Sequence, residues 1–253
     1  MNIDTGRVRA VFRKEVRQFR RNRAIVVTMG ILPLLFLTGP MINIFSLSAT
    51  ADSSTVRAVV GSVLLLMLIV PVILPAAIAS YSVVGERDQG TLEPLLTTPV
   101  RRGELMLGKG LAAVLPAVAV TYVLYVVFVV AVRLWATDAV FSDLWQVGPI
   151  LAEVLFAPLL AIWSVGVAMA ISTRSTDVRV AQQLSTLASL PPLGLAILLT
   201  FRVIAPTVLS AIAIGFAIIV LDGFACWGAA KMLDRERLIV GRSAPRRERT
   251  QGT

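Results

Sequence analysis

Long apolar runs alternate along the chain with short, mostly basic loops. Inside these runs, charge is confined to Glu153 and Asp222. A helix needs about 20 apolar residues to cross about 30 Å of hydrocarbon. The pattern predicts an all-α, polytopic membrane protein with six transmembrane helices at about 24–45, 58–84, 110–132, 149–172, 180–200 and 207–230.

The basic residues fall on alternate sides of the predicted spans. The N-terminal segment, the 85–109 loop, the 173–179 loop and the C-terminal tail carry 21 of the 24 lysines and arginines. The three on the other side are Arg57, Arg133 and Arg202. Because positively charged loops stay in the cytoplasm, we expect both termini there and the chain in the cytoplasmic (inner) membrane.

Composition agrees with a bundle of bilayer helices: 57% of residues are hydrophobic, 15% are charged and the mean hydropathy is +0.82. The basic residues flank the spans, so we expect them to attract anionic lipid headgroups and no nucleic acid. With no histidine and one cysteine, the chain cannot build a Ser-His-Asp centre, a His-ligated metal site or an internal disulfide. Cys226 lies in the last run, where we expect a small buried side chain.

Residues 1–23 are predicted to form a basic amphipathic helix that lies in the inner headgroup layer and bends into the first span as an elbow. Its phenylalanines are expected to dip into the membrane; the alternative is a solvated basic tail. The next apolar run exceeds the 7–15 residues of a signal-peptide core, so we interpret it as an uncleaved span. The six-helix domain is then predicted over 24–232, and 233–253 as a disordered basic tail. The apolar stripe of the first helix comprises Val8, Val11, Phe12, Val16 and Phe19.

The longest loop on the basic side, Glu86–Lys109, contains a predicted short helix at about 91–99. Gly90 ends the preceding helix, and Thr91 can cap the new one by accepting a hydrogen bond from an unpaired backbone N–H. Pro99 stops the helix, because proline has no N–H to continue the ladder.

This short helix is predicted to be amphipathic. Glu93 and Pro94 suit its first turn, where a carboxylate faces the positive end of the helix dipole. Leu92, Leu95 and Leu96 fall on one face. A helix of about two turns is not stable alone, so we expect its leucine face to pack against the membrane surface, the ends of the bundle or a partner protein.

The loop matches the pattern E-x-x-x-G-T-x-E-x-L-L-x-T-P followed by G-K. This pattern resembles the signature of ABC-2 type transporter permeases, the membrane subunits of a class of ATP-driven exporters. The six-span layout, the N-terminal amphipathic helix and the segment at 177–183 extend the resemblance over nearly the whole chain. The matching residues are Glu86, Gly90, Thr91, Glu93, Leu95, Leu96, Thr98, Pro99, Gly108 and Lys109.

The resemblance implies that 86–99 is a coupling segment seated in a cleft of a separate ATP-binding cassette protein. It also implies two permease subunits, identical or homologous, assembled with two such ATPases. ATP and magnesium would bind to the ATPase, so this chain is expected to hold no cofactor and to be no enzyme itself. The residues expected to contact the ATPase are Glu86, Gly90, Thr91, Leu92, Glu93, Leu95, Leu96 and Pro99.

One stretch imitates a phosphate-binding loop. Residues 103–110 satisfy G-x-x-x-x-G-K, but Gly110 replaces the Ser or Thr that holds magnesium and no strand precedes the stretch. We therefore expect no nucleotide site there, and we expect Lys109 to extend toward the inner interface.

The two charges inside the spans are candidate pathway residues. Asp222 is expensive in hydrocarbon and is expected to face a cavity or partner, where it could pair with a cationic substrate, relay a proton or hydrogen-bond within the bundle. Glu153 lies near the outer end of its span, where we expect access to water. Prolines within the spans are either hinges or fixed kinks; they are Pro33, Pro40, Pro71, Pro75, Pro116, Pro158, Pro191 and Pro192.

Three functions differ in what they require. An ATP-driven exporter of hydrophobic or amphipathic cargo needs a separate ATPase. An ion- or proton-coupled transporter or channel would use Asp222 and Glu153 and need no ATPase, but the sequence shows no inverted repeat. A membrane-embedded enzyme is disfavoured by the lack of histidine and of an acid–base cluster.

Overall fold

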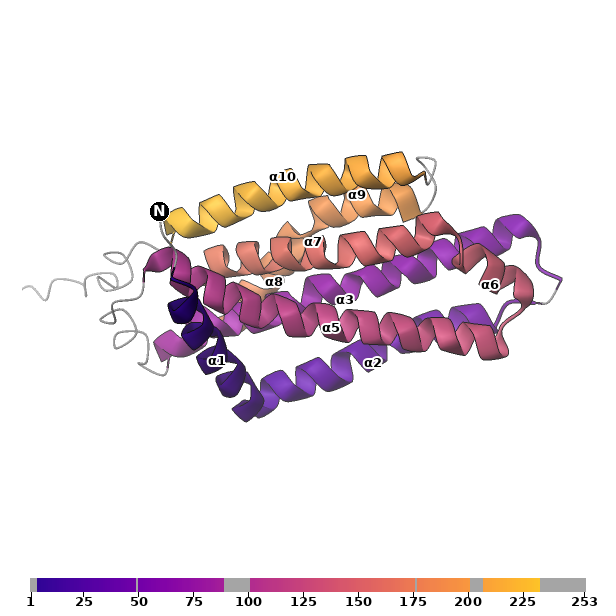
Figure 1. Ribbon diagram of the computed structural model, residues 1–253. Coiled ribbons are helices and arrows are strands. Elements are labelled where there is room, and N and C mark those ends of the chain that lie inside the picture. Colours follow the sequence, from indigo (N-terminus) through magenta and orange to yellow (C-terminus); the bar gives the residue numbers. More distant parts are fainter. Residues whose placement is uncertain (1–3, 49, 89–100, 176, 201–206, 233–253) are drawn as a thin grey trace, which may run out of the picture.

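The computed structural model describes residues 4–48, 50–88, 101–175, 177–200 and 207–232. Every regular element in these ranges is a helix (Figure 1). The elements are α1 (Thr5–Arg21), α2 (Arg23–Phe45), α3 (Ser53–Asp88), α5 (Arg102–Trp135), α6 (Asp138–Leu144), α7 (Val147–Ser172), α8 (Val178–Ala188), α9 (Leu190–Thr200) and α10 (Val208–Met232).

Six helical stretches within the described residues are long and apolar enough to cross a membrane, as predicted. They are α2, α3, α5, α7, the α8–α9 pair and α10. The helices α3 and α5 begin before their apolar runs, at Ser53 and Arg102. The length of an apolar run indicates which part of a helix can lie in the hydrocarbon, whereas the helix itself, held by backbone hydrogen bonds, continues into polar sequence.

The fifth span is two helices rather than one. Helix α8 ends at Ala188 and α9 begins at Leu190, with Ser189 between them. Pro191 and Pro192 follow at once, and proline neither donates to the helical ladder nor favours a helical residue before it. The other prolines named above lie inside continuous helices.

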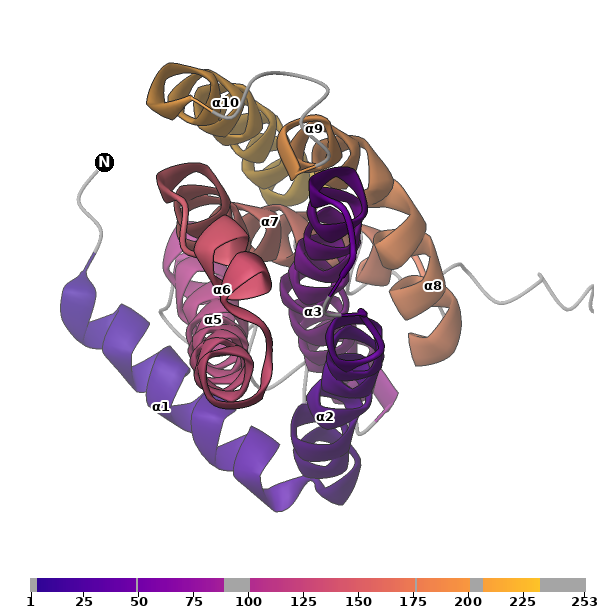
Figure 2. The same cartoon turned by 90° about the vertical axis from the view of Figure 1, so that its right-hand side faces the viewer.

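The helices run back and forth along one bundle. Figure 1 shows α1, the starts of α2 and α5 and the ends of α7 and α10 at one end, and α6 with the starts of α3 and α10 at the other. Seen down the bundle in Figure 2, α3, α5 and α7 lie between α2 on one side and α9 and α10 on the other. The beginning of α1 and the end of α10 therefore lie on the same side of the bundle.

Three apolar clusters hold the bundle together. One joins α2, α3, α5 and α6 around Phe128; the second joins α1, α2, α3, α5 and α7 around Leu74; the third joins α3, α7, α9 and α10 around Phe156. Large apolar side chains also cover the outside of the bundle, such as Val123 and Phe224, which are 62% and 66% exposed. Such exposure is expected of helices whose outer faces contact lipid or a second subunit.

Helix α6 was not predicted from the sequence. It occupies the 133–148 loop and buries Val140 and Leu144, which are four residues apart. These side chains pack against the beginning of α3 and the C-terminal end of α5. Its signal was the Asp138 carboxylate in a first turn after Thr137. At seven residues it is too short for apolar periodicity to reveal.

Helix α1 confirms the predicted N-terminal helix and corrects the environment of its apolar stripe. In Figure 2 it crosses the outside of α5 and reaches α2. Val11 and Phe19 are 6% and 5% exposed, and Phe19 belongs to the cluster that joins α1, α2, α3, α5 and α7. The expectation that Phe19 dips into the membrane was wrong, because α1 lies against the bundle and uses this face for protein packing.

Candidate coupling and pathway sites

The start of α5 is in close contact with α1. A Cβ atom built on Gly108 would lie 2.6 Å from Cγ1 of Val11 and 3.1 Å from the carbonyl oxygen of Val8. Real Cβ atoms do not approach other heavy atoms to 2.6 Å. Only glycine therefore allows the two helices to pack at this separation.

An ion pair lies beside this contact. The Nζ atom of Lys109 donates to Oε1 of Glu15 at 2.7 Å, and the two side chains are 3% and 1% exposed. The Nζ atom of Lys14, whose side chain is half-exposed, lies 3.1 Å from the same Oε1 atom of Glu15. Lys109 was expected to extend toward the inner interface; its ammonium group is instead held by a buried carboxylate on α1.

The Glu15 carboxyl is ionised in this setting. Burial opposes ionisation, but the charges and hydrogen bonds of Lys109 and Lys14 outweigh it, so the pKa of Glu15 lies below its ordinary value of 4.5. A buried ion pair needs good geometry to offset desolvation. Here the short contact between Lys109 and Glu15 supplies that geometry.

A second set of polar contacts fixes the N-terminus of α5. One carboxylate oxygen of Glu104 accepts a hydrogen bond from the backbone N–H of Arg101 at 2.8 Å, and the other accepts from the N–H of Asp4 at 3.0 Å. Arg7 approaches the same carboxylate at 3.7 Å. A carboxylate at this position also favours the positive end of the helix dipole. Glu104 therefore ties the first turn of α5 to the residue that caps α1.

These contacts lie directly after the predicted coupling segment. The backbone of Glu86 is in the last turns of α3, and the segment's exit leads to Arg101 and α5. The predicted helix at 91–99 lies outside the described residues. So do seven of the predicted ATPase-contact residues, which are Gly90, Thr91, Leu92, Glu93, Leu95, Leu96 and Pro99.

The segment at 103–110 forms the first turns of α5. From Leu105 onward its N–H groups are used by the helix, beginning with the bond from Leu105 to the carbonyl of Arg101. The segment therefore does not form the phosphate-binding loop that its glycine spacing imitates. Among the described residues, no cluster of acidic or cysteine side chains is suited to a metal ion.

Glu153 lies near the start of α7 and is 1% exposed. Neither of its carboxylate oxygens has a hydrogen-bond partner among the described residues. The expectation that it has access to water was wrong for the isolated subunit, because its side chain is almost fully buried. A buried carboxyl without a partner is costly, so a role in function is worth testing.

An open groove of about 500 Å³ lies between α5 and the start of α7, and Glu153 is not among the residues that line it. Ile150 and Val154 line it from α7, one on either side of Glu153 in the helix. The hydroxyl of Tyr122 donates to the carbonyl of Val154 at 2.8 Å, and that of Tyr125 is buried without a partner among the described residues. The remaining walls are Val126, Val129, Val130 and Trp145.

Asp222 lies in the second half of α10 and is 7% exposed, and its Oδ1 atom has no hydrogen-bond partner in the described part of the chain. Contacts of Gly215 with Leu155 and of Gly166 with Ala225 set the register of α10 against α7. In this register Asp222 is about nine residues, or roughly 14 Å, farther along the bundle than Glu153. The two carboxyl groups therefore do not form one site.

Cys226 corrects another expectation, because its side chain is exposed rather than buried. It lies one turn beyond Asp222 on α10, a helix whose outer face carries many exposed apolar residues. The segment at 177–183 opens α8, where the side chain of Asp177 accepts a hydrogen bond from the N–H of Arg179 at 2.6 Å. This cap explains why the fifth span begins there.

The helices and their apolar outer faces define a multi-pass integral membrane protein. A family model described as "ABC-2 family transporter protein" matches residues 9–220. The chain therefore belongs to the ABC-2 transporter family, whose members are membrane components that in general work with an ATP-binding subunit. A comparison with curated proteins gives no significant match.

The contact geometry that the sequence did not reveal is the junction of α1 and α5. Gly108 and Lys109 were noted as part of a motif, but Glu15 is 94 positions away from Lys109. The available signal was a single carboxylate, Glu15, on an otherwise basic helix. Helical spacing places it between Val11 and Phe19, on the face that packs against the bundle.

Proposed function

We propose that this protein is the permease subunit of an ATP-binding cassette exporter in the cytoplasmic membrane. It moves a hydrophobic or amphipathic substrate and holds no nucleotide itself. ATP and magnesium bind to a separate cassette ATPase, present in two copies, and a second permease subunit, identical or homologous, completes the path. Both termini and the 86–99 segment face the cytoplasm, where α1 lies along the inner headgroup layer as an elbow.

The observation that carries the proposal, beside family membership, is the fixed junction at the exit of the 86–99 segment. Glu104 joins Arg101 to Asp4, and five residues farther along α5, Lys109 joins the helix to Glu15. A push on the segment would therefore move α5 and α1 as one unit. Rigid coupling of this kind lets a short cytoplasmic helix act on a membrane span, because packed helices shift between discrete arrangements.

The apolar outer faces support a path between two subunits. Several helices present large side chains outward, among them Leu209 of α10 and Leu35 of α2, which are 78% and 60% exposed. A path lined by such faces suits hydrophobic or amphipathic cargo. Asp222 and Glu153 are the polar residues that we assign to this path, each at its own level.

A reconstitution tests the proposal. The chain is purified together with a candidate cassette ATPase and placed in liposomes, and ATP hydrolysis is measured. We expect a complex of two permeases and two ATPases, with hydrolysis reduced by Glu86→Gln and Glu93→Ala. Asp138→Asn is the matched control, because it removes an exposed carboxylate at the other end of the bundle. Unchanged hydrolysis and assembly in both test variants would contradict the coupling role.

An ion- or proton-coupled transporter is the second candidate. Glu153 and Asp222 favour it, because their carboxyl groups have buried oxygens without a hydrogen-bond partner among the described residues, and such groups line proton and ion paths in membrane proteins. It predicts ion flux in liposomes that contain this chain alone under a proton gradient, and loss of that flux in Glu153→Gln or Asp222→Asn. The exporter proposal predicts no flux until the ATPase and ATP are supplied.

A further inference from the structure

Four arginines of α1 lie outside the buried face of the helix. Val11, Glu15 and Phe19 form the buried face of the helix. The arginines line an open hollow of about 580 Å³ together with Phe12 and Val16. All four are exposed, and none forms an ion pair with another described residue; they are Arg13, Arg17, Arg20 and Arg21.

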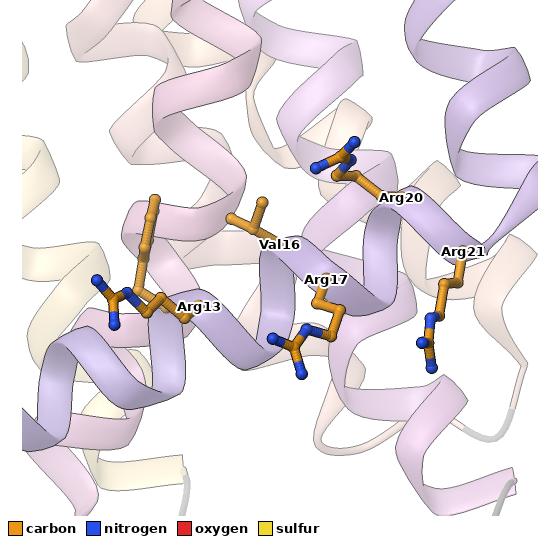
Figure 3. A pocket seen from close by; sticks show the side chains of 6 residues that line it. Arg13, Val16, Arg17, Arg20 and Arg21 are labelled. Carbon is orange, nitrogen blue, oxygen red and sulfur yellow. The ribbon is translucent and has the colours of Figure 1, made fainter.

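The hollow runs between two ridges of the helix. Arg13, Arg17 and Arg21 follow one another at steps of four and form one ridge, and Val16 and Arg20 belong to the next. Figure 3 shows Val16 and Arg20 extending on one side of the α1 ribbon, and Arg17 and Arg21 on the other. An anion seated along α1 would therefore meet guanidinium groups from both sides.

A second hollow, of about 370 Å³, adjoins the first. The two share Phe12, Val16 and Arg20, but the walls of the second are apolar. Helix α2 contributes Val26 and Met29, and the wall from α5 consists of Leu115 and Pro116. Arg20 borders it with its methylene stem, as basic residues do at a boundary between oil and water.

We propose that these adjoining hollows bind one anionic phospholipid, with its phosphate on the arginines of α1 and an acyl chain in the groove between α1, α2 and α5. The charge of the first hollow selects an anion, since guanidinium groups match phosphate oxygens in geometry as well as in charge. The apolar second hollow requires that the anion carry a hydrocarbon chain. A free phosphate satisfies only the first condition, and a zwitterionic lipid neutralises much of the attraction.

A lipid in this position would act on the coupling junction. It would contact the exposed ridges of α1, whose buried face holds Lys109 through Glu15. The site would therefore stabilise the docking of α1 on α5. This inference uses the proposed interfacial position of α1 but not the ATPase, so the two proposals can fail separately.

Native mass spectrometry of the full chain in mild detergent tests the proposal. The probes are dioleoylphosphatidylglycerol, dioleoylphosphatidylcholine and glycerol phosphate, titrated separately. We expect tight binding of the first only. A basic side chain near an anionic lipid surface contributes a factor of about five in affinity, so the paired change Arg17→Gln and Arg20→Gln should weaken it about 25-fold. Arg9→Gln is the matched control, because this exposed arginine of α1 does not line the hollow.

The apolar half is tested by filling it. Val26→Trp and, independently, Leu115→Trp should each weaken phosphatidylglycerol binding about tenfold or more. These side chains are 49% and 52% exposed, so the larger ring can be accommodated without disrupting the core. The thermal midpoint of each variant is measured without lipid. A midpoint equal to that of the unmodified protein shows that the variant's fold is intact.

Four results would overturn the proposal. Binding of phosphatidylcholine as tight as that of phosphatidylglycerol would show that the arginines do not select an anionic headgroup. Equal binding of glycerol phosphate would reduce the site to a small-anion site. Unchanged lipid affinity in the paired arginine variant would place the lipid elsewhere. The fourth result is a dimer that retains no lipid and that dissociates in the paired arginine variant. It would show that a second copy of the chain covers the hollow. None of these results bears on ATP-driven transport.

Discussion

The ammonium group of Lys109 lies 2.7 Å from the carboxylate of Glu15, and both side chains are almost fully buried. This pair joins the first turns of α5 to the middle of α1 beside the close contact between Gly108 and Val11. Two features of the sequence, a motif that ends in Gly-Lys and an amphipathic N-terminal helix, are thus parts of one junction.

Breaking the pair from one side should be costly. Lys109→Met leaves the Glu15 carboxylate buried without its main counter-charge, and such changes destabilise by about 3–5 kcal/mol. Unfolding in mixed micelles measures the change. The double variant Lys109→Met with Glu15→Met should recover most of the loss, because well-packed apolar residues can replace a buried ion pair.

Lys14→Met serves as the control for this pair. Lys14 contacts the same carboxylate from a side chain that is 42% exposed, and exposed pairs contribute about 0–1 kcal/mol. A loss in Lys14→Met as large as that in Lys109→Met would show that the buried geometry is not the cause.

The glycine at the crossing should tolerate no side chain. Gly108→Ala forces α1 away from α5, because the new Cβ would meet Val11 at 2.6 Å. We expect a loss of about 1–3 kcal/mol, as for other overpacked sites. Gly103→Ala, in the same helix with nothing within 4 Å of a built Cβ, should be neutral or slightly stabilising. Thermal midpoints of the two variants make the comparison, and equal midpoints would contradict the close packing.

Acid should weaken the junction through Glu15. Because the pKa of this carboxyl is lower in the folded protein than its ordinary 4.5, its contribution to stability is complete above about pH 4.5. That contribution is lost as the pH falls through the folded pKa. Unfolding free energies measured across this window should fall for the unmodified chain, and Glu15→Gln should flatten the dependence. An identical pH profile in both would show that another group controls the response.

Removing the carboxyl of Glu153 should stabilise the isolated subunit. Its oxygens are buried and lack partners among the described residues, so Glu153→Leu removes a desolvation penalty of about 1–3 kcal/mol. A thermal midpoint above that of the unmodified protein is expected, together with reduced transport. A lower midpoint would indicate that a bound partner or substrate satisfies the carboxyl.

Sequence patterns predicted the spans well, because the bilayer requires long apolar runs; five of the six predicted runs each correspond to a single helix, and the fifth run is divided between α8 and α9. They predicted less where contacts join distant residues. Nothing near Lys109 in the sequence indicates Glu15, and Glu153 looked accessible only because its predicted span begins nearby, at about residue 149. The break at Ser189 was readable from the two prolines after it, whereas helix α6 was too short to show a period.

The roles assigned to the 86–99 segment remain predictions, since residues 89–100 lie outside the described ranges. They rest on the family resemblance. Three features predicted from the local sequence support them: a threonine cap, a glutamate in the first turn and a leucine face. The structure adds the tie at the exit of the segment, which runs from Arg101 through Glu104 to Asp4.

The most direct test of the account is photocrosslinking from Leu92, on the predicted contact face, after replacement by a photoreactive amino acid. In membranes that contain the cassette ATPase, the account predicts a crosslink to that ATPase, and none when the probe replaces Ser142, an exposed residue of α6 at the other end of the bundle. No crosslink from Leu92, or labelling of this position by an impermeant reagent added outside intact cells, would contradict it.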